Sequence, residues 1–342
     1  MKFAIGIGRN ETINEVGDHA RVAEESGFDF LSAVDMPFLS REVDSMMTMA
    51  ALNTKSIMIG QGVTDPVTRH PLVVANAAAT IDELSGGRAF VGIGTGGPWG
   101  KPMTKPSKLK ELREAVEFIK KYTAGEEVEW QGVKFQSEWC KRQLPIYMAC
   151  GGARSCQLAG ELADGVISPS NADITTNKWR LEQVAIGCEK VDRDPHQIDF
   201  WIRGMIHISE SKEAARYEAA GYAVNAAYLM WSVLNTKGPE AEELRKRLVK
   251  EYPTIVEDCK KVHDNFDPAY MEHPDSPAAA FITPQMLDTM EVVGTGEQVC
   301  EQLKRIEEAG FKTFGTVTYT LKDKREMMQR IGEVVIPQFK NT

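Results

Sequence analysis

Strand-like and helix-like segments alternate along almost the whole of this 342-residue chain, and this alternation constrains the fold most strongly. Eight short apolar segments are predicted as strands, each followed by at least one segment in which apolar residues have helical spacing. The predicted strands are 3–8, 28–34, 56–63, 89–94, 145–149, 165–168, 198–208 and 313–318. Strands separated by helices pair in parallel, because each helix forms the crossover to the next strand. Eight such units predict an α/β fold, a closed (β/α)₈ TIM barrel, rather than an open doubly wound sheet.

Two segments interrupt the alternation, and we expect both to be insertions into a single barrel domain spanning residues 1–342. The first, at about 123–144, contains a predicted β-hairpin that turns at Gln131-Gly132. The second, at about 211–290, is predicted to be mostly helical and lies between the seventh and eighth strands. Its aromatic and Met side chains suit either core packing or a lid over a substrate pocket, and the sequence leaves both open.

The net charge and the spacing of the cysteines and histidines limit which partners and metals we expect this protein to bind. The net charge of −9 and the pI of about 5.4 disfavour nucleic acid and anionic membranes as partners. The six cysteines show no Cys-x-x-Cys pair and no zinc spacing, and the histidines show no metal-ligand spacing, so we expect no metal. Met1 runs directly into the first strand without a secretory signal, and no apolar run reaches membrane-spanning length. We therefore expect a cytoplasmic protein with reduced thiols in its core.

Two predicted strands end in glycine-rich runs, at the barrel end where active sites form. The third strand ends in Gly60-Gln61-Gly62-Val63-Thr64-Asp65-Pro66, where the glycines permit either a tight turn or close approach of a ligand to the backbone. The fourth ends in Val91-Gly92-Ile93-Gly94-Thr95-Gly96-Gly97, which contains the Gly-x-Gly-x-x-Gly pattern of dinucleotide sites. Prolines at 98 and 102 follow, so no helix is predicted there to receive a pyrophosphate, and a Rossmann site is disfavoured.

A third glycine turn, Gly151-Gly152-Ala153-Arg154-Ser155, leads from the fifth strand into a helix. Free backbone N–H groups at the helix start and the Arg154 side chain would form a phosphate cradle, which Ser168 after the sixth strand would extend. A plain loop with a surface arginine fits the same residues equally well.

Asp35, Asp65 and His70 are the candidate catalytic side chains. Asp35 ends the second strand, where a carboxylate accepts from a ligand or caps the following segment. His70 precedes a predicted helix, and it suits an acid–base role or, more commonly, a structural hydrogen bond.

The runs 62–71, 78–89 and 92–96, together with 145–149, 158–165 and 292–295, resemble the bacterial luciferase-like superfamily. Within it the sequence is most similar to the branch dependent on coenzyme F420, typified by methylenetetrahydromethanopterin reductase. The resemblance covers nearly the whole chain and is weakest at 211–285. It implies a (β/α)₈ barrel, usually dimeric, that binds F420 or FMN at the carboxyl ends of the strands and acts on a small molecule.

The resemblance also implies roles for particular residues. Gly62-Val63 matches a cis peptide bond that supports the cofactor ring, and Asp35 and Asp65 match polar cofactor contacts. The remaining matched cofactor positions are Thr64, Gly94, Thr95, Gly96, Gly97, Gly151, Gly152, Ala153, Arg154, Ser155 and Ser168.

Two departures separate this chain from the sugar-phosphate dehydrogenases of the family. Met36 stands where those proteins have a His, and Gly97 where they have a Glu, so the acid–base pair for alcohol oxidation is absent. We therefore predict F420-dependent hydride transfer to or from an activated C=N or C=C bond, which needs less acid–base help. The alternatives are an FMN-dependent monooxygenase that uses reduced flavin and O₂, and a non-catalytic flavin-binding homologue.

Overall fold

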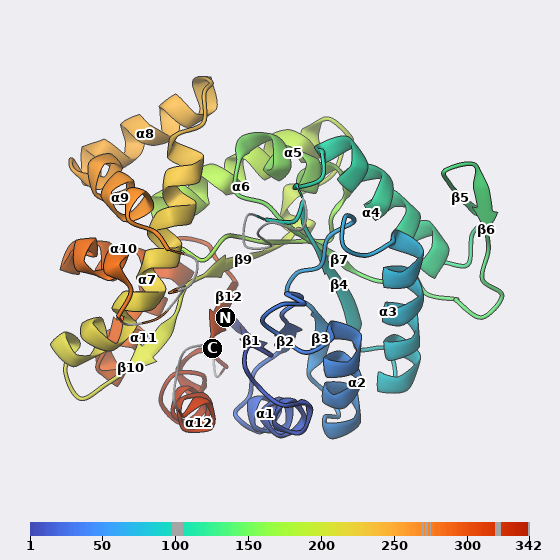
Figure 1. Cartoon of the computed structure of the whole chain (residues 1–342), viewed down its shortest axis with the longest axis horizontal. Helices are drawn as coiled ribbons and strands as arrows, with labels where there is room; N and C mark the ends of the chain where they lie inside the picture. Colours follow the sequence, from blue (N-terminus) through green and yellow to red (C-terminus); the bar gives the residue numbers. More distant parts are fainter. Residues whose placement is uncertain (98–104, 268–269, 271–272, 274, 319–322, 341–342) are drawn as a thin grey trace.

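Eight parallel strands close into a barrel in the computed structural model of this protein (Figure 1), as the alternation predicts. The structure describes residues 1–340 except 98–104, 268–269, 271–272, 274 and 319–322. The order around the barrel is β1-β12-β9-β8-β7-β4-β3-β2. The barrel strands are β1 (Lys2–Ile7), β2 (Phe30–Ala33), β3 (Met58–Gln61), β4 (Ala89–Ile93), β7 (Ile146–Ala149), β8 (Gly165–Ile167), β9 (Asp199–Arg203) and β12 (Thr313–Val317).

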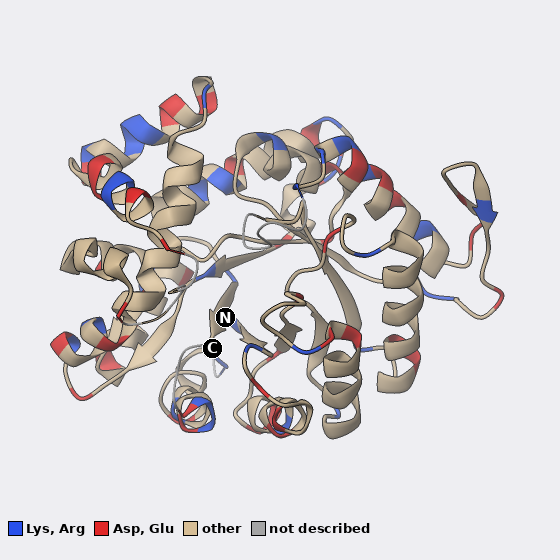
Figure 2. Ribbon diagram, viewed as in Figure 1, with Lys and Arg blue, Asp and Glu red and all other residues tan. Residues whose placement is uncertain are grey.

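Helices follow the strands and cover the outside of the barrel (Figure 1). They are α1 (Ile13–Glu25), α2 (Val43–Asn53), α3 (Pro71–Ser85), α4 (Leu109–Thr123), α5 (Ala153–Leu162), α6 (Ile174–Glu189), α11 (Gly296–Glu308), α12 (Lys324–Val334) and α13 (Pro337–Lys340). Acidic and basic residues alternate along the outer helices, whereas the central strands are almost free of charge (Figure 2). Among the described residues, no helix is long and apolar enough to cross a membrane.

The two predicted insertions lie on opposite sides of the barrel (Figure 1). The hairpin of β5 (Val128–Trp130) and β6 (Val133–Phe135) turns at Gln131-Gly132 as predicted, and both turn residues have positive φ. The second segment contains α7 (Lys212–Leu234), α8 (Pro239–Glu251), α9 (Ile255–Asp264), η4 (Pro277–Phe281) and α10 (Pro284–Met290). Residues 267–284 of this segment, which are rich in Pro, fall partly outside the described residues.

The predicted seventh strand, 198–208, is wrong as one continuous element. The chain leaves the barrel after β9, and β10 (Ile206–Ile208) pairs in parallel with β11 (Val292–Gly294) in a separate two-stranded sheet. At the break, the Gly204 N–H donates to the Gly315 carbonyl and the Met205 N–H donates to the buried Glu291 carboxylate. These tertiary contacts divide an apolar run that sequence periodicity shows as unbroken.

Aromatic side chains fill the barrel interior below its carboxyl end. Phe30, Phe90, Tyr147 and Trp201 pack against one another, with ring centroids 4.8–6.0 Å apart. Strand glycines make room for these rings: a Cβ on Gly60 would lie 2.4 Å from the Phe90 ring, and one on Gly165 would lie 2.3 Å from the Tyr147 ring. This aromatic cluster fills the barrel interior and forms the floor beneath the strand ends where the site lies.

Candidate functional site

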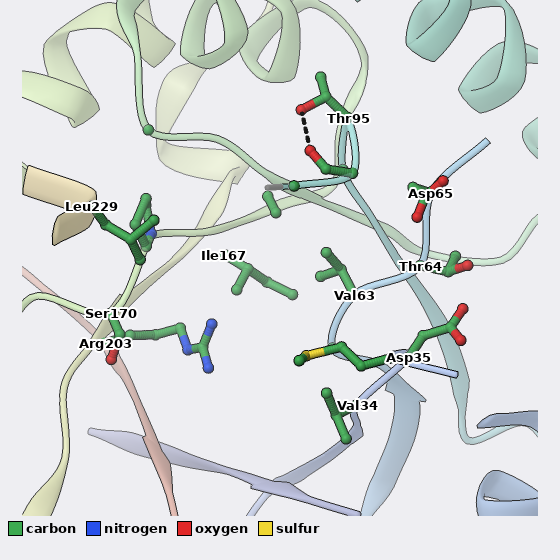
Figure 3. A pocket seen from close by; sticks show the side chains of 18 of the residues that line it. Val34, Asp35, Val63, Thr64, Asp65, Thr95, Ile167, Ser170, Arg203 and Leu229 are labelled. Carbon is green, nitrogen blue, oxygen red and sulfur yellow. Dashed lines mark hydrogen bonds between the residues drawn. The ribbon is translucent and has the colours of Figure 1, made fainter. Parts of the chain in front are cut away.

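A cavity of about 400 Å³ lies at the carboxyl ends of the barrel strands, where the sequence places the site. Val63 and Ile167 lie near its centre, Asp65 and Thr95 on one side, and Arg203 and Leu229 on the other (Figure 3). The strand-end residues that line it are Arg9, Val34, Asp35, Met36, Pro37, Phe38, Gly62, Val63, Thr64, Asp65, Thr68, Gly94, Thr95, Gly96, Gly97, Ala149, Cys150, Gly151, Ile167, Ser168, Pro169, Ser170 and Arg203. Helix α7 adds Tyr222, Asn225 and Leu229.

The chain after β3 forms the first wall of the cavity. The Gly62-Val63 peptide bond is cis, as the family resemblance implies. Thr64 then pairs with β4: its N–H donates to the Gly92 carbonyl, and its own carbonyl accepts from the Gly94 N–H. The buried Thr64 hydroxyl has no hydrogen-bond partner among the described residues. Thr64 is fully buried and its side chain points away from Val63 (Figure 3), so this hydroxyl is not exposed to the cavity.

The glycines after β4 keep this wall thin. A Cβ on Gly94 would lie 3.2 Å from the Ala149 Cβ and 3.4 Å from a Val63 methyl group, so a side chain there would occupy the cavity wall. Gly96 has a φ of +75° and lies beside the Asp65 carboxylate. Because these positions present backbone, a flat molecule can approach closely between Val63 and the opposite wall. The predicted absence of a helix after Gly97 concerns residues outside the described part of the chain.

Asp35 lies at the cavity but is held by an arginine that the sequence analysis did not select. The Arg69 Nε donates to the Asp35 Oδ2 at 2.8 Å, and its other nitrogens bind Asp44 at 3.1 Å and Glu42 at 2.8 Å. The Asp35 side chain is only 3% exposed. Burial raises the pKa of Asp44 to about 6, with the neighbouring carboxylates of Glu42 and Asp35 adding to the effect and Arg69 opposing it. Asp35 therefore has the geometry of a fixed, ion-paired wall residue rather than of a free base.

Asp65 and His70, the other two candidate catalytic groups, both make local backbone contacts. The Asp65 Oδ1 accepts from the N–H groups of Val67 and Thr68, so this carboxylate stabilises its own turn while lining the cavity. His70 does not line the cavity: it caps α3, where its Nδ1 accepts from the Leu72 N–H, and its ring packs edge-on against Trp130. The structure thus corresponds to the structural alternative for His70.

The predicted phosphate cradle is only partly brought to the cavity. Gly151 and Ser168 line it, and α5 begins at Gly152 without a side-chain cap, which leaves backbone N–H groups available there. The Ser155 hydroxyl donates to the Gly152 carbonyl. Arg154 is exposed and lines a separate surface depression beside α4, so its predicted place in the cradle is not supported. Helical geometry explains this, since successive residues of the first turn point in different directions.

Sequence reasoning missed four residues on the α7 side of the cavity: Ile167, Arg203, Asn225 and Leu229. Strand alternation was a usable signal for Arg203, because Trp201 lies in the barrel interior and residues two apart share a face. Tyr222, which also lines the cavity, is one of the aromatic residues of the insertion for which the sequence left core packing and a lid both open. No signal marked Asn225 and Leu229, since only tertiary packing turns one face of α7 toward the barrel. The Tyr222 and Ser170 hydroxyls hydrogen-bond at 2.6 Å and so connect α7 to the end of β8.

Taken together, these features define a TIM-barrel protein with a mainly apolar cavity at glycine-rich strand ends. The chain belongs to the luciferase-like monooxygenase family, whose model matches residues 2–313.

Two relatives and one solved structure extend this comparison. The chain is 30% identical to a 5,10-methylenetetrahydromethanopterin reductase of Archaeoglobus fulgidus, over 99% of this chain and 100% of that protein. It is 32% identical to an F420-dependent hydroxymycolic acid dehydrogenase of Mycobacterium tuberculosis, over 58% of this chain and 60% of that protein. The solved structure of a coenzyme F420-dependent tetrahydromethanopterin reductase from Methanopyrus kandleri has the same fold, with a TM-score of 0.76, 21% identity and 99% of each chain covered.

Proposed function

We propose that this protein is an F420-dependent oxidoreductase of the methylenetetrahydromethanopterin reductase type, acting on an activated C=N or C=C bond. One observation carries the proposal: the cavity has glycine-rich backbone on one wall, at the strand ends where the family resemblance implies a cofactor ring. The names of the F420-dependent relatives agree with this cofactor.

The residues present fit a deazaflavin in shape and in donor chemistry. The apolar side chains of Val34, Val63 and Ile167 suit the faces of a ring. The Gly94–Gly97 backbone would contact the ring, and the Gly151 turn at the start of α5 would hold a phosphate through its N–H groups. Gly152, Ala153 and Ser155 belong to the same turn, and Ser168 would extend it.

When bound, F420 supplies a ring carbon that donates or accepts a hydride. The chain's own contribution would then be placement: the strand ends would hold the ring, and α7 would shield the opposite side of the cavity from water. Asp35, fixed by Arg69, and Asp65, fixed by its turn, keep their negative charges at defined places on the rim. With Met36 at the wall and Gly97 in the strand-end run, the predicted absence of a His/Glu acid–base pair agrees with an already activated substrate.

Titration of the purified protein with F420 and with FMN, followed by cofactor fluorescence, tests the cofactor. We expect saturable F420 binding and much weaker FMN binding, followed by oxidation of reduced F420 when methylenetetrahydromethanopterin is added. Tight FMN binding with no F420 binding, or O₂ consumption coupled to reduced FMN, would instead identify the monooxygenase alternative. Binding of F420 without turnover of any C=N or C=C substrate would identify the non-catalytic one.

We also infer a cytoplasmic location and a homodimer or higher homo-oligomer. All six cysteines are free and buried, which suits a reducing compartment. Size-exclusion chromatography with light scattering measures the oligomeric state, and a monomer at all concentrations would contradict the dimer.

A further inference from the structure

Four charged side chains line the cavity, and three of them already have partners. Asp35 is paired with Arg69, and Asp65 accepts hydrogen bonds from its own turn. Arg9 is not free either. The fourth, Arg203, ends β9, and its guanidinium has no hydrogen bond or ion pair within the described part of the chain.

The strand pairing aims Arg203 into the cavity. Residues two apart on β9 share a face, so Arg203 follows Trp201 on the inner side of the barrel. Arg203 is paired in register with Gly315 of β12, and a Cβ on Gly315 would lie 2.9 Å from the Arg203 Cγ and 3.5 Å from its Cδ. The missing side chain therefore lets the arginine stem lie across the neighbouring strand, as Gly60 does for Phe90 and Gly165 for Tyr147.

Partial burial of the Arg203 charge costs hydration free energy, which a bound anion would offset. The cavity lining is mainly apolar, and Arg203 is partly buried within it, so its charge is incompletely hydrated. Protein cations in such places usually pair with a carboxylate, yet the two carboxylates of the lining are engaged elsewhere. The planar guanidinium is suited to bidentate contact with a carboxylate or phosphate group.

We propose that Arg203 binds an anionic group, a carboxylate or a phosphate, of the substrate. The inference rests on the proposed function, because it assigns the glycine side of the cavity to the cofactor and the α7 side to the substrate. Arg203 and Leu229 lie across the cavity from Asp65 and Thr95 (Figure 3), and the Ser170–Tyr222 hydrogen bond closes the same side. Arg203 is thus a specificity residue that selects acidic substrates and fixes their orientation toward the ring.

Anion binding to the protein without cofactor provides a first test. Inorganic phosphate and acetate, compared with chloride at matched ionic strength, should raise the unfolding temperature of the wild type, since a ligand that binds only the native state stabilises it. Arg203→Gln should abolish the rise given by acetate and reduce the rise given by phosphate, because the Gly151 turn still offers phosphate its N–H groups. Arg305→Gln, which removes an exposed arginine on α11, should retain both rises. The anion whose effect falls more in Arg203→Gln distinguishes a phosphate from a carboxylate substrate group. An unchanged rise in Arg203→Gln would overturn the proposal.

Kinetics with F420 and methylenetetrahydromethanopterin provide the second test. In Arg203→Gln we expect KM to rise about 30-fold, the loss of one charge-assisted contact, with kcat changed far less and F420 affinity unchanged. Arg203→Lys should have a KM between those of the wild type and Arg203→Gln, because lysine keeps the charge but not the planar guanidinium that makes two parallel hydrogen bonds. Gly315→Ala, which displaces the arginine stem without removing the charge, should give an intermediate KM.

The outcomes separate this proposal from the proposed function. If the wild type binds no F420, the proposed function fails, while the anion titration still decides whether Arg203 binds anions. If Arg203→Gln weakens F420 binding as much as it weakens the substrate, the arginine holds the cofactor and the substrate assignment is overturned.

Discussion

The two sides of the cavity are formed by different kinds of groups, mainly backbone on one side and side chains on the other. On the β3–β4 side, glycine backbone and the turn at Asp65 form the wall, with few side chains projecting from it. On the α7 side, Arg203, Tyr222 and Leu229 supply the surface through long side chains, some of them from a helix outside the βα repeat. Backbone walls tolerate little change in shape, whereas side chains on an added helix can be replaced one at a time. This difference agrees with the proposed assignment of the first side to the cofactor and of the second to the substrate.

Filling the backbone wall should have the largest effect. Gly94→Val places methyl groups where even a Cβ is already 3.2 Å from Ala149, so we expect F420 affinity to fall at least about 100-fold. Leu229→Ala on the α7 side is the matched control and should leave F420 affinity within about threefold. Fluorescence titration measures both, and circular dichroism checks that each variant folds. Equal losses in the two variants would remove the distinction between the sides.

Removing the arginine beneath the cavity rim should have the next largest effect. Arg69→Met leaves the carboxylates of Asp35, Asp44 and Glu42 close together without their cation, and we expect a loss of about 3 kcal/mol in the free energy of unfolding. Urea denaturation measures it. Arg21→Met is the control, because Arg21 forms exposed pairs on α1 and should cost less than about 1 kcal/mol. Similar losses in the two variants would show that burial of the Arg69 cluster contributes nothing.

The raised pKa of Asp44 predicts a pH dependence in this same cluster. The folded state holds the Asp44 proton up to a pH of about 6, whereas the unfolded chain releases it near the ordinary value of 3.8. Between these values the folded state binds more protons, so this group's contribution to stability falls as pH rises from about 4 to about 6, by on the order of 1–2 kcal/mol after allowance for its partial exposure. Asp44→Asn should flatten the stability profile in that window. A profile that keeps its slope in Asp44→Asn would assign the titration to another group.

The smallest effect is expected at Arg154. Its side chain lies on the outer surface near α4, so Arg154→Gln should change F420 affinity by less than about threefold and stability by less than about 0.5 kcal/mol. The same fluorescence titration measures this. A loss of F420 affinity of tenfold or more would show that Arg154 contributes to the phosphate cradle. A charged side chain, as well as backbone, would then form that side of the cavity.

Most of the barrel and one side of the site were predictable because their signals are local. Apolar periodicity located all eight barrel strands, and glycine runs identified the ends of β3 and β4. The features that the sequence did not predict depend on tertiary structure. The division of 198–208 depends on contacts with Glu291 and Gly315, and the position of Arg154 depends on the direction in which its side chain leaves α5. His70, by contrast, corresponds to the structural alternative that the sequence left open, through a local hydrogen bond from the Leu72 N–H.

The sequence by itself determined that eight βα units form a closed parallel barrel, since the period of apolar residues and the crossover helices admit few other arrangements. It also determined where the backbone is exposed to the cavity, because only glycine has no side chain to cover it. The tertiary structure alone decided which charges are neutralised: Arg69 meets Asp35 across 34 positions of sequence, while Arg203 lies over Gly315 and faces the cavity. Electrostatic pairing depends on distance in space, and strand register together with the packing of α7 sets that distance.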